Sequence, residues 1–67
     1  MTKHKMQQVS STIIVDYDAI TFHNHVDNIL AIIDSHGNDS ILHYSTTTIN
    51  SDTIVYSAYI QEVKYYD

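Results

Sequence analysis

A chain of 67 residues can form only one domain, and so small a domain buries only roughly 60% of its unfolded surface, which leaves its stability marginal unless something adds to it. Cysteine is absent, which excludes disulfides and cysteine-based zinc sites. Self-association or a metal held by other ligands is then the remaining source of stability. The longest apolar runs, such as residues 29–33, are far shorter than the roughly 18 residues of a membrane span. We therefore expect a cytoplasmic protein without membrane contacts.

Residues 10–67 are predicted to form a single α+β domain, preceded by a flexible arm over residues 1–9. The first predicted element is a strand over residues 11–17, because that segment is short and rich in β-branched side chains. Alternation along this strand would place Asp16 and Asp18 on one face, about 7 Å apart by strand rise. A pair of carboxylates would then project from one side of the strand.

A helix is predicted next, over residues 22–36. Apolar side chains recur there with the helical period, at Phe22, Val26, Ile29, Leu30 and Ile33. Thr21 is the expected N-cap, and Gly37 is expected to end the helix in a left-handed conformation. Asp27 and Asp34 lie seven residues apart and therefore on one stripe of this helix.

Two further strands, residues 40–48 and 53–66, are predicted to form an antiparallel hairpin around a turn at residues 49–52. The predicted fold is thus β-α-β-β, with one amphipathic helix packed on a small three-stranded sheet. A single helix covers only one sheet face, so the other face would stay exposed and mark an interface. We expect a homodimer whose interface is formed by Val55, Tyr59, Val63 and Tyr65.

Neither catalytic residues nor a cofactor is predicted, and we expect no enzymatic activity. The sequence has no G-x-S-x-G elbow and no glycine-rich phosphate loop. His23-Asn24-His25 is the most metal-like feature, but residues two apart point to different faces of a helix and cannot bind one ion there. His23 with Asp27, four residues apart, could do so. A metal site would need a third ligand from His36, His43 or Asp39, and capping or surface roles explain these histidines more simply. No structural role for a metal is predicted.

The distribution of charge is the strongest indication of function. The three lysines lie near the chain ends, at Lys3, Lys5 and Lys64. Residues 6–63 contain no lysine or arginine, which argues against direct binding of nucleic acid. Such a negative field either maintains solubility alone or attracts a basic partner. In the second case the candidate partner-binding residues are Asp16, Asp18, Asp27, Asp34, Asp39, Asp52 and Glu62.

The lysine-free acidic middle, DYDAITFHNHVDNILAIIDSHGND, and the tyrosine-rich tail, VYSAYIQEVKYY, resemble the small acidic host-takeover proteins of phages that infect Gram-positive bacteria. Within that group the chain is most similar to the phage inhibitors of the nucleoid protein HU. The resemblance covers the whole chain through size, charge and element order, and it transfers no individual residue. It implies a dimer in the host cytoplasm that occupies the DNA-binding surface of a basic host protein, with carboxylates in place of phosphates.

Two other functions stay open. A phage protein of this size could sequester a small signalling nucleotide between protomers, with tyrosines stacking on the bases. The lack of arginine argues against this function, because other donors would have to hold the phosphates. The chain could also be a structural or assembly subunit.

Overall fold

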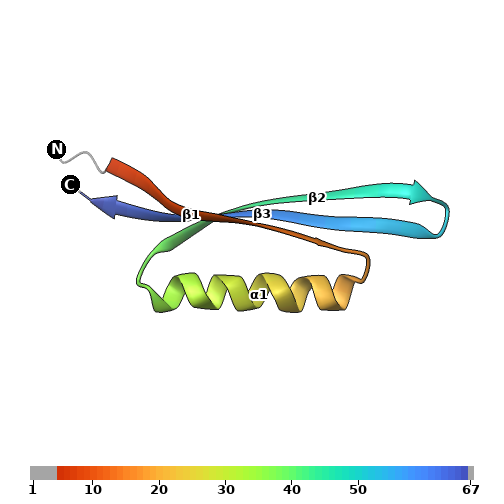
Figure 1. Ribbon diagram of the computed structural model, residues 1–67, viewed down its shortest axis with the longest axis horizontal. Coiled ribbons are helices and arrows are strands. Elements are labelled where there is room, and N and C mark those ends of the chain that lie inside the picture. The colour runs from red at the N-terminus through yellow and green to blue at the C-terminus, as the bar shows by residue number, and fades with distance from the viewer. Residues whose placement is uncertain (1–4, 67) are drawn as a thin grey trace.

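Three long strands and one helix make up the computed structural model, which describes residues 5–66 (Figure 1). The elements follow the order β1 (Lys5–Asp16), α1 (Ala19–Ser35), β2 (Asp39–Asn50) and β3 (Thr53–Tyr66). The strands form one antiparallel sheet in the order β1-β3-β2, so β3 is the central strand. The predicted α+β fold with one helix on a three-stranded sheet is confirmed.

The arrangement of the strands follows from how the chain connects them. β1 and β2 both pair antiparallel with β3, so they run parallel to each other at the two edges of the sheet. Parallel strands need a crossover connection, and α1 provides it by running back along one face of the sheet (Figure 1). The β2–β3 hairpin then completes the fold, as predicted.

β1 is longer than expected, because it begins at Lys5. The flexible arm predicted over residues 1–9 is therefore wrong for residues 5–9, and residues 1–4 lie outside the described part of the chain. Pairing with β3 starts with Lys5 opposite Tyr66, so this segment is held by the ladder of backbone hydrogen bonds.

α1 begins three residues earlier than predicted, and its N-cap is Asp18. The Asp18 carboxylate accepts hydrogen bonds from the backbone N–H and the hydroxyl of Thr21, both at 2.8 Å. These bonds satisfy a backbone donor that the first turn of a helix leaves free. The prediction of Thr21 as the N-cap is wrong, because Asp and Thr both cap helices well and their spacing in this sequence allows either start.

The C-terminus of α1 is close to its predicted place. Ser35 is the last helical residue, His36 is the C-cap, and Gly37 adopts a φ of 75°. The Gly37 N–H donates to the carbonyl oxygen of Asp34 at 2.9 Å, which satisfies an acceptor that the helix end leaves free. The left-handed conformation expected at Gly37 is confirmed.

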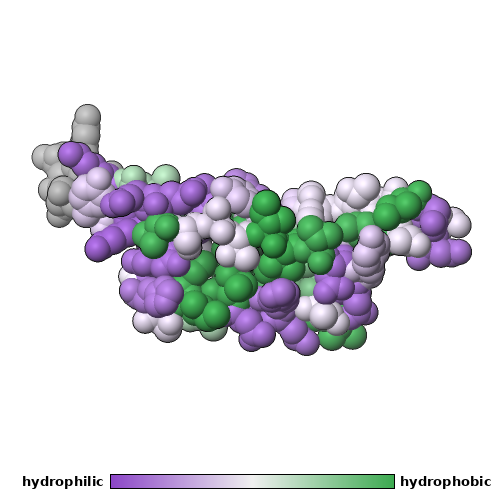
Figure 2. Space-filling model, in the orientation of Figure 1, coloured by the Kyte–Doolittle hydropathy of each residue, from purple (hydrophilic) through white to green (hydrophobic). Residues whose placement is uncertain are grey.

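The core lies between α1 and the sheet face that the helix covers. Each large apolar side chain buried there contributes about 1.5–3 kcal/mol, so this packing holds the helix on the sheet. Figure 2 shows apolar side chains reaching the surface along the junction of the helix and the sheet. The fully buried members of the core cluster are Ile14, Phe22, Val26, Ile33, Ala58 and Ile60.

The domain is elongated, with extents of 52 × 21 × 16 Å. Figure 1 shows the β2–β3 hairpin projecting past the N-terminal end of α1, and we call this end the hairpin end. Lys5 pairs with Tyr66, and Gln7 pairs with Lys64, so both of these lysines lie at the opposite end of the sheet. We call it the lysine end.

Candidate functional site

Two of the predicted partner-binding carboxylates lie at the start of α1. Asp16 ends β1 and Asp18 is the N-cap, so the prediction that both lie on one face of a strand is wrong. The Asp16 carboxylate accepts a hydrogen bond from the N–H of Asp18 at 3.0 Å. The backbone N–H and then the hydroxyl of Thr21 hold the pKa of Asp18 below its ordinary value of 3.8. Asp18 is therefore an exposed anion at neutral pH that also fixes the start of the helix.

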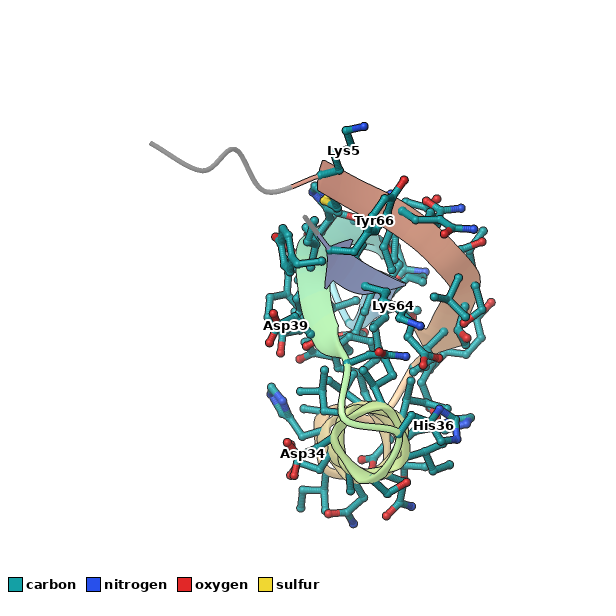
Figure 3. All side chains as sticks on the ribbon, turned by 90° about the vertical axis from the view of Figure 1, so that its left-hand side faces the viewer. Lys5, Asp34, His36, Asp39, Lys64 and Tyr66 are labelled. Atoms are coloured by element: carbon teal, nitrogen blue, oxygen red, sulfur yellow. The ribbon has the colours of Figure 1, made fainter. Side chains whose placement is uncertain are left out.

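A second set of carboxylates follows the side of α1 that is nearer to β2. Asp27 and Asp34 are exposed and lie about 10 Å apart along the helix axis. In Figure 3, Asp34 and Asp39 lie on the same side of the molecule, and Asp39 is the first residue of β2. We call Asp27, Asp34 and Asp39 the acidic row. These three side chains offer negative charge to a partner that approaches this side.

Glu62 is not a surface residue, so its prediction as a partner-binding residue is wrong. It is only 6% exposed, and its carboxylate accepts hydrogen bonds from the Ser10 hydroxyl at 3.1 Å and the Asn38 amide at 2.7 Å. The Nδ1 atom of His36 lies 2.9 Å from the same carboxylate and must carry a proton, because an ionised carboxylate only accepts. The Asn38 amide and then the His36 imidazole hold the pKa of Glu62 below its ordinary 4.5, against the effect of burial. Glu62 therefore links the end of α1 to the sheet.

Asp52 lies apart from the other carboxylates, in the turn between β2 and β3. Its N–H donates to the side-chain oxygen of Asn50 at 2.9 Å, which stabilises the turn. Lys5 and Lys64 are the two basic residues, histidine excluded, within residues 5–66, and both lie at the lysine end. The hairpin end and the middle of the domain therefore carry carboxylates without a lysine or arginine. The electrostatic field there favours cations.

The sheet face opposite α1 carries exposed apolar side chains. Ile13 and Val15 of β1 are 71% and 59% exposed. On the central strand, Tyr59 pairs with Ile13 of β1 and with His43 of β2. The rings of His43 and Tyr59 are stacked, with their centroids 5.8 Å apart. We call the surface formed by Ile13, Val15, His43, Val55 and Tyr59 the uncovered face. Its exposed apolar area makes it a candidate contact surface.

The structure changes the predicted dimer interface in two respects. Val55, Tyr59 and Tyr65 remain at least partly exposed, but Val63 is fully buried within the protomer and cannot contact a partner. β3 is paired on both edges, so a partner can reach it only through the sheet face. Ile13 on β1, which the sequence prediction omitted, offers more exposed apolar surface than the predicted β3 positions.

An aromatic pocket lies on the helix-facing side of the sheet, where the N-terminal half of α1 meets the β2–β3 hairpin. The ring centroids of Phe22 and Tyr44 are 6.1 Å apart, and those of Phe22 and Tyr56 are 5.7 Å apart. Sequence reasoning missed this pocket, because the two tyrosines become diagonal neighbours only through the pairing of Thr46 with Tyr56. The cavity of about 290 Å³ is lined by Phe22, His23, Tyr44, Ser45, Thr46 and Tyr56.

The histidines considered as metal ligands lie in different parts of the domain. His23 lines the aromatic pocket, His36 contacts Glu62, and His43 stacks on Tyr59. Within residues 5–66, no three His, Asp or Glu side chains gather closely enough to hold a metal ion. No helix in the same residue range is long and apolar enough to cross a membrane.

Comparisons with protein families, with curated proteins and with solved structures found no match to this chain. The acidic row, the uncovered face and the aromatic pocket are therefore the features from which a function can be inferred.

Proposed function

We propose that this protein is a non-enzymatic acidic binding protein that inhibits a basic DNA-binding protein of the HU type. It would occupy the partner's DNA-binding surface as a DNA mimic, with carboxylates contacting the lysines and arginines that otherwise contact phosphates. The observation that carries the proposal is the placement of charge. Six of the seven candidate carboxylates are exposed or half-exposed along the domain, and the two described lysines are confined to one end.

The physical requirement for mimicry is a dense set of negative charges in a fixed arrangement. Duplex DNA presents one charge per about 1.7 Å of its axis, a density that a small domain approaches only by clustering its acids. The acidic row supplies three carboxylates on one side of the molecule, and two of them are on the same helix. Charges held together by a folded scaffold steer a basic partner into encounter and orient it.

The proposed active form is a homodimer joined through the uncovered face. Two such faces can stack as sheets do in a sandwich, about 10 Å apart, and this would bury Ile13 and Val15. On this face, β3 from Val55 to Gln61 and the paired positions on β1 and β2 include no Lys, Arg, Asp or Glu. Two negatively charged protomers would thus meet where their repulsion is weakest. Dimerisation would also double the number of acidic rows.

Competition with DNA is the direct test. A purified HU-type protein bound to labelled duplex DNA should release the DNA when this protein is added, and the release should weaken steeply with salt. The Debye length falls from about 30 Å at 0.01 M to about 8 Å at 0.15 M, so long-range steering is lost first. A protein that does not displace DNA at low salt would refute the proposal.

Paired substitutions identify the contacting surface. Asp27→Asn with Asp34→Asn removes two charges from the acidic row at nearly constant shape. Asp16→Asn with Asp18→Asn makes the same change in charge at the start of α1, and asparagine still caps a helix. If only one of the two double variants loses binding to the HU-type protein, the substituted pair lies in the contact surface. Unchanged binding of both pairs, at low and high salt, would mean that the acidity serves only solubility.

A parallel titration with a cyclic dinucleotide distinguishes mimicry from the sequestration of a signalling nucleotide. The proposal predicts that the cyclic dinucleotide does not bind, because residues 5–66 contain no arginine and their two lysines, which could hold phosphates, both lie at the lysine end.

A further inference from the structure

Three aromatic rings surround the pocket at the N-terminal half of α1. Phe22 is almost fully buried and forms its base, whereas Tyr44 is 56% exposed at its edge. Both tyrosine rings have their centroids within 6.1 Å of the Phe22 centroid, and all three residues line the same cavity. Aromatic faces attract a cation placed within about 6 Å of the ring, and the attraction increases when water is excluded.

Carboxylates lie beside this pocket on two sides. Asp16 pairs with Tyr56 across the β1–β3 ladder, which places the two side chains on one sheet face with Cβ atoms about 5 Å apart. Asp27 follows His23 by one helical turn, so it lies next to the rim on the α1 side. Neither α1 nor the β2 strand contains a lysine or arginine. The carboxylates are not part of the pocket lining, but they flank its apolar rings with negative charge, and this environment is complementary to a cation with a flat, weakly hydrated surface.

The size of the pocket restricts the ligand further. A cavity of about 290 Å³ lies at the lower limit of the ~300–1,000 Å³ typical of small-molecule sites. This volume accommodates a side-chain head group with the end of its stem.

We infer that the aromatic pocket binds the guanidinium group of an arginine side chain on the basic partner. The guanidinium stacks on the tyrosine rings while Asp16 and Asp27 accept from its N–H groups or compensate its charge. This inference rests on the proposed function for the identity of the arginine's source. The pocket would hold one particular side chain of the partner, whereas the acidic row alone provides only electrostatic attraction.

The test uses short capped peptides, Gly-Arg-Gly and the same peptide with citrulline, which has nearly the shape of arginine without the charge. NMR titration of the full chain should show the arginine peptide shifting the resonances of Phe22, Tyr44 and Tyr56. The citrulline peptide should bind at least about tenfold more weakly, a difference of ~1.4 kcal/mol. Equal binding of the two peptides would overturn the inference, and so would tighter binding of a Gly-Lys-Gly peptide.

Tyr44→Leu keeps the apolar bulk of the pocket edge and removes the ring. It should weaken binding of the arginine peptide about tenfold. Tyr66→Leu is the matched control, because Tyr66 is a similarly exposed tyrosine, 45% against 56%, at the lysine end. Asp27→Asn should weaken binding less and should reduce its salt dependence. Equal effects of the two tyrosine substitutions would overturn the inference.

The two proposals fail separately. If the arginine peptide binds the pocket but the HU-type protein does not bind the chain, the pocket assignment stands and DNA mimicry falls. If the HU-type protein binds and displaces DNA but the peptide shifts only the acidic row, the assignment of the pocket is wrong.

Discussion

Replacing Ile13 with threonine tests whether the uncovered face joins two protomers. Ile13 is 71% exposed in the protomer, and full burial of an isoleucine side chain contributes about 1.5–3 kcal/mol. About 1–2 kcal/mol therefore remains to be gained in a dimer. A two-fold interface contains the residue twice, which gives about 2–4 kcal/mol. Threonine retains one methyl group and the β-branched shape, so we expect the lower part of this range, an increase in the dimer dissociation constant of roughly 30-fold to 100-fold.

Sedimentation equilibrium over a range of concentrations measures this constant directly. Ile20→Thr is the matched control, because Ile20 is 73% exposed but belongs to α1 on the other side of the sheet. It should leave the dissociation constant unchanged. Two results would refute the reasoning: a wild-type protein that is monomeric at tens of micromolar, or a control variant that dissociates as readily as Ile13→Thr.

The other predictions concern stability. Because the pKa of Glu62 is lowered, its carboxylate stabilises the fold fully above its ordinary pKa of 4.5, and this stabilisation is lost as the pH falls through the lowered pKa. Glu62→Gln should therefore flatten the decline of the thermal midpoint in acid, measured by circular dichroism. Ile60→Ala, at a side chain that is 1% exposed, should lower the free energy of unfolding in urea by about 2–5 kcal/mol. Gly37→Ala should lower it by about 1–2 kcal/mol through the left-handed backbone alone, because no atom lies within 4 Å of the added Cβ. Unfolding curves equal to those of the wild type would contradict each expectation.

The fold could be predicted because its local signals agree with one another. The helical period from Phe22 to Ile33 and the β-branched segments on either side specify one helix and three strands. The central position of β3 was not predicted, since strand order depends on which strands the helix connects and not on their composition. That position determines which edges are free, and so it also changes how a dimer can form.

The sequence prediction misassigned Glu62 because the burial of this residue depends on contacts with residues far away in the sequence. Glu62 is bonded to Ser10, His36 and Asn38, which are 52, 26 and 24 residues away in the sequence. Its burial is therefore a product of tertiary structure that no local pattern reveals. A register shift between Gln8 and Ser10 leaves Val9 unpaired in the same region, and such a bulge interrupts the alternation from which exposure is predicted.

The exposed carboxylates were easier to predict, because charged side chains remain solvated unless specific partners compensate them. Asp27 and Asp34 are found on one exposed stripe, as helical geometry requires. The aromatic pocket could not be predicted in the same way. It requires the β2–β3 register and the position of α1 together, and neither is contained in the spacing of the tyrosines.

The proposed dimer and the proposed arginine pocket together predict that Ile13→Thr affects the binding of two ligands differently. In a dimer stacked through the uncovered faces, α1 of each protomer lies on the outer side, so both acidic rows and both pockets stay accessible. A dimeric basic partner could then engage two pockets at once, and the second contact gains from its high effective concentration, which can strengthen binding by 10²-fold or more. Ile13→Thr should therefore weaken binding to a dimeric HU-type protein, most strongly at protein concentrations where the variant is monomeric. Binding of the single-arginine peptide should not change, because each pocket is built within one protomer. If Ile13→Thr weakens both interactions to the same degree, the pocket depends on the dimer, and the two surfaces are not independent.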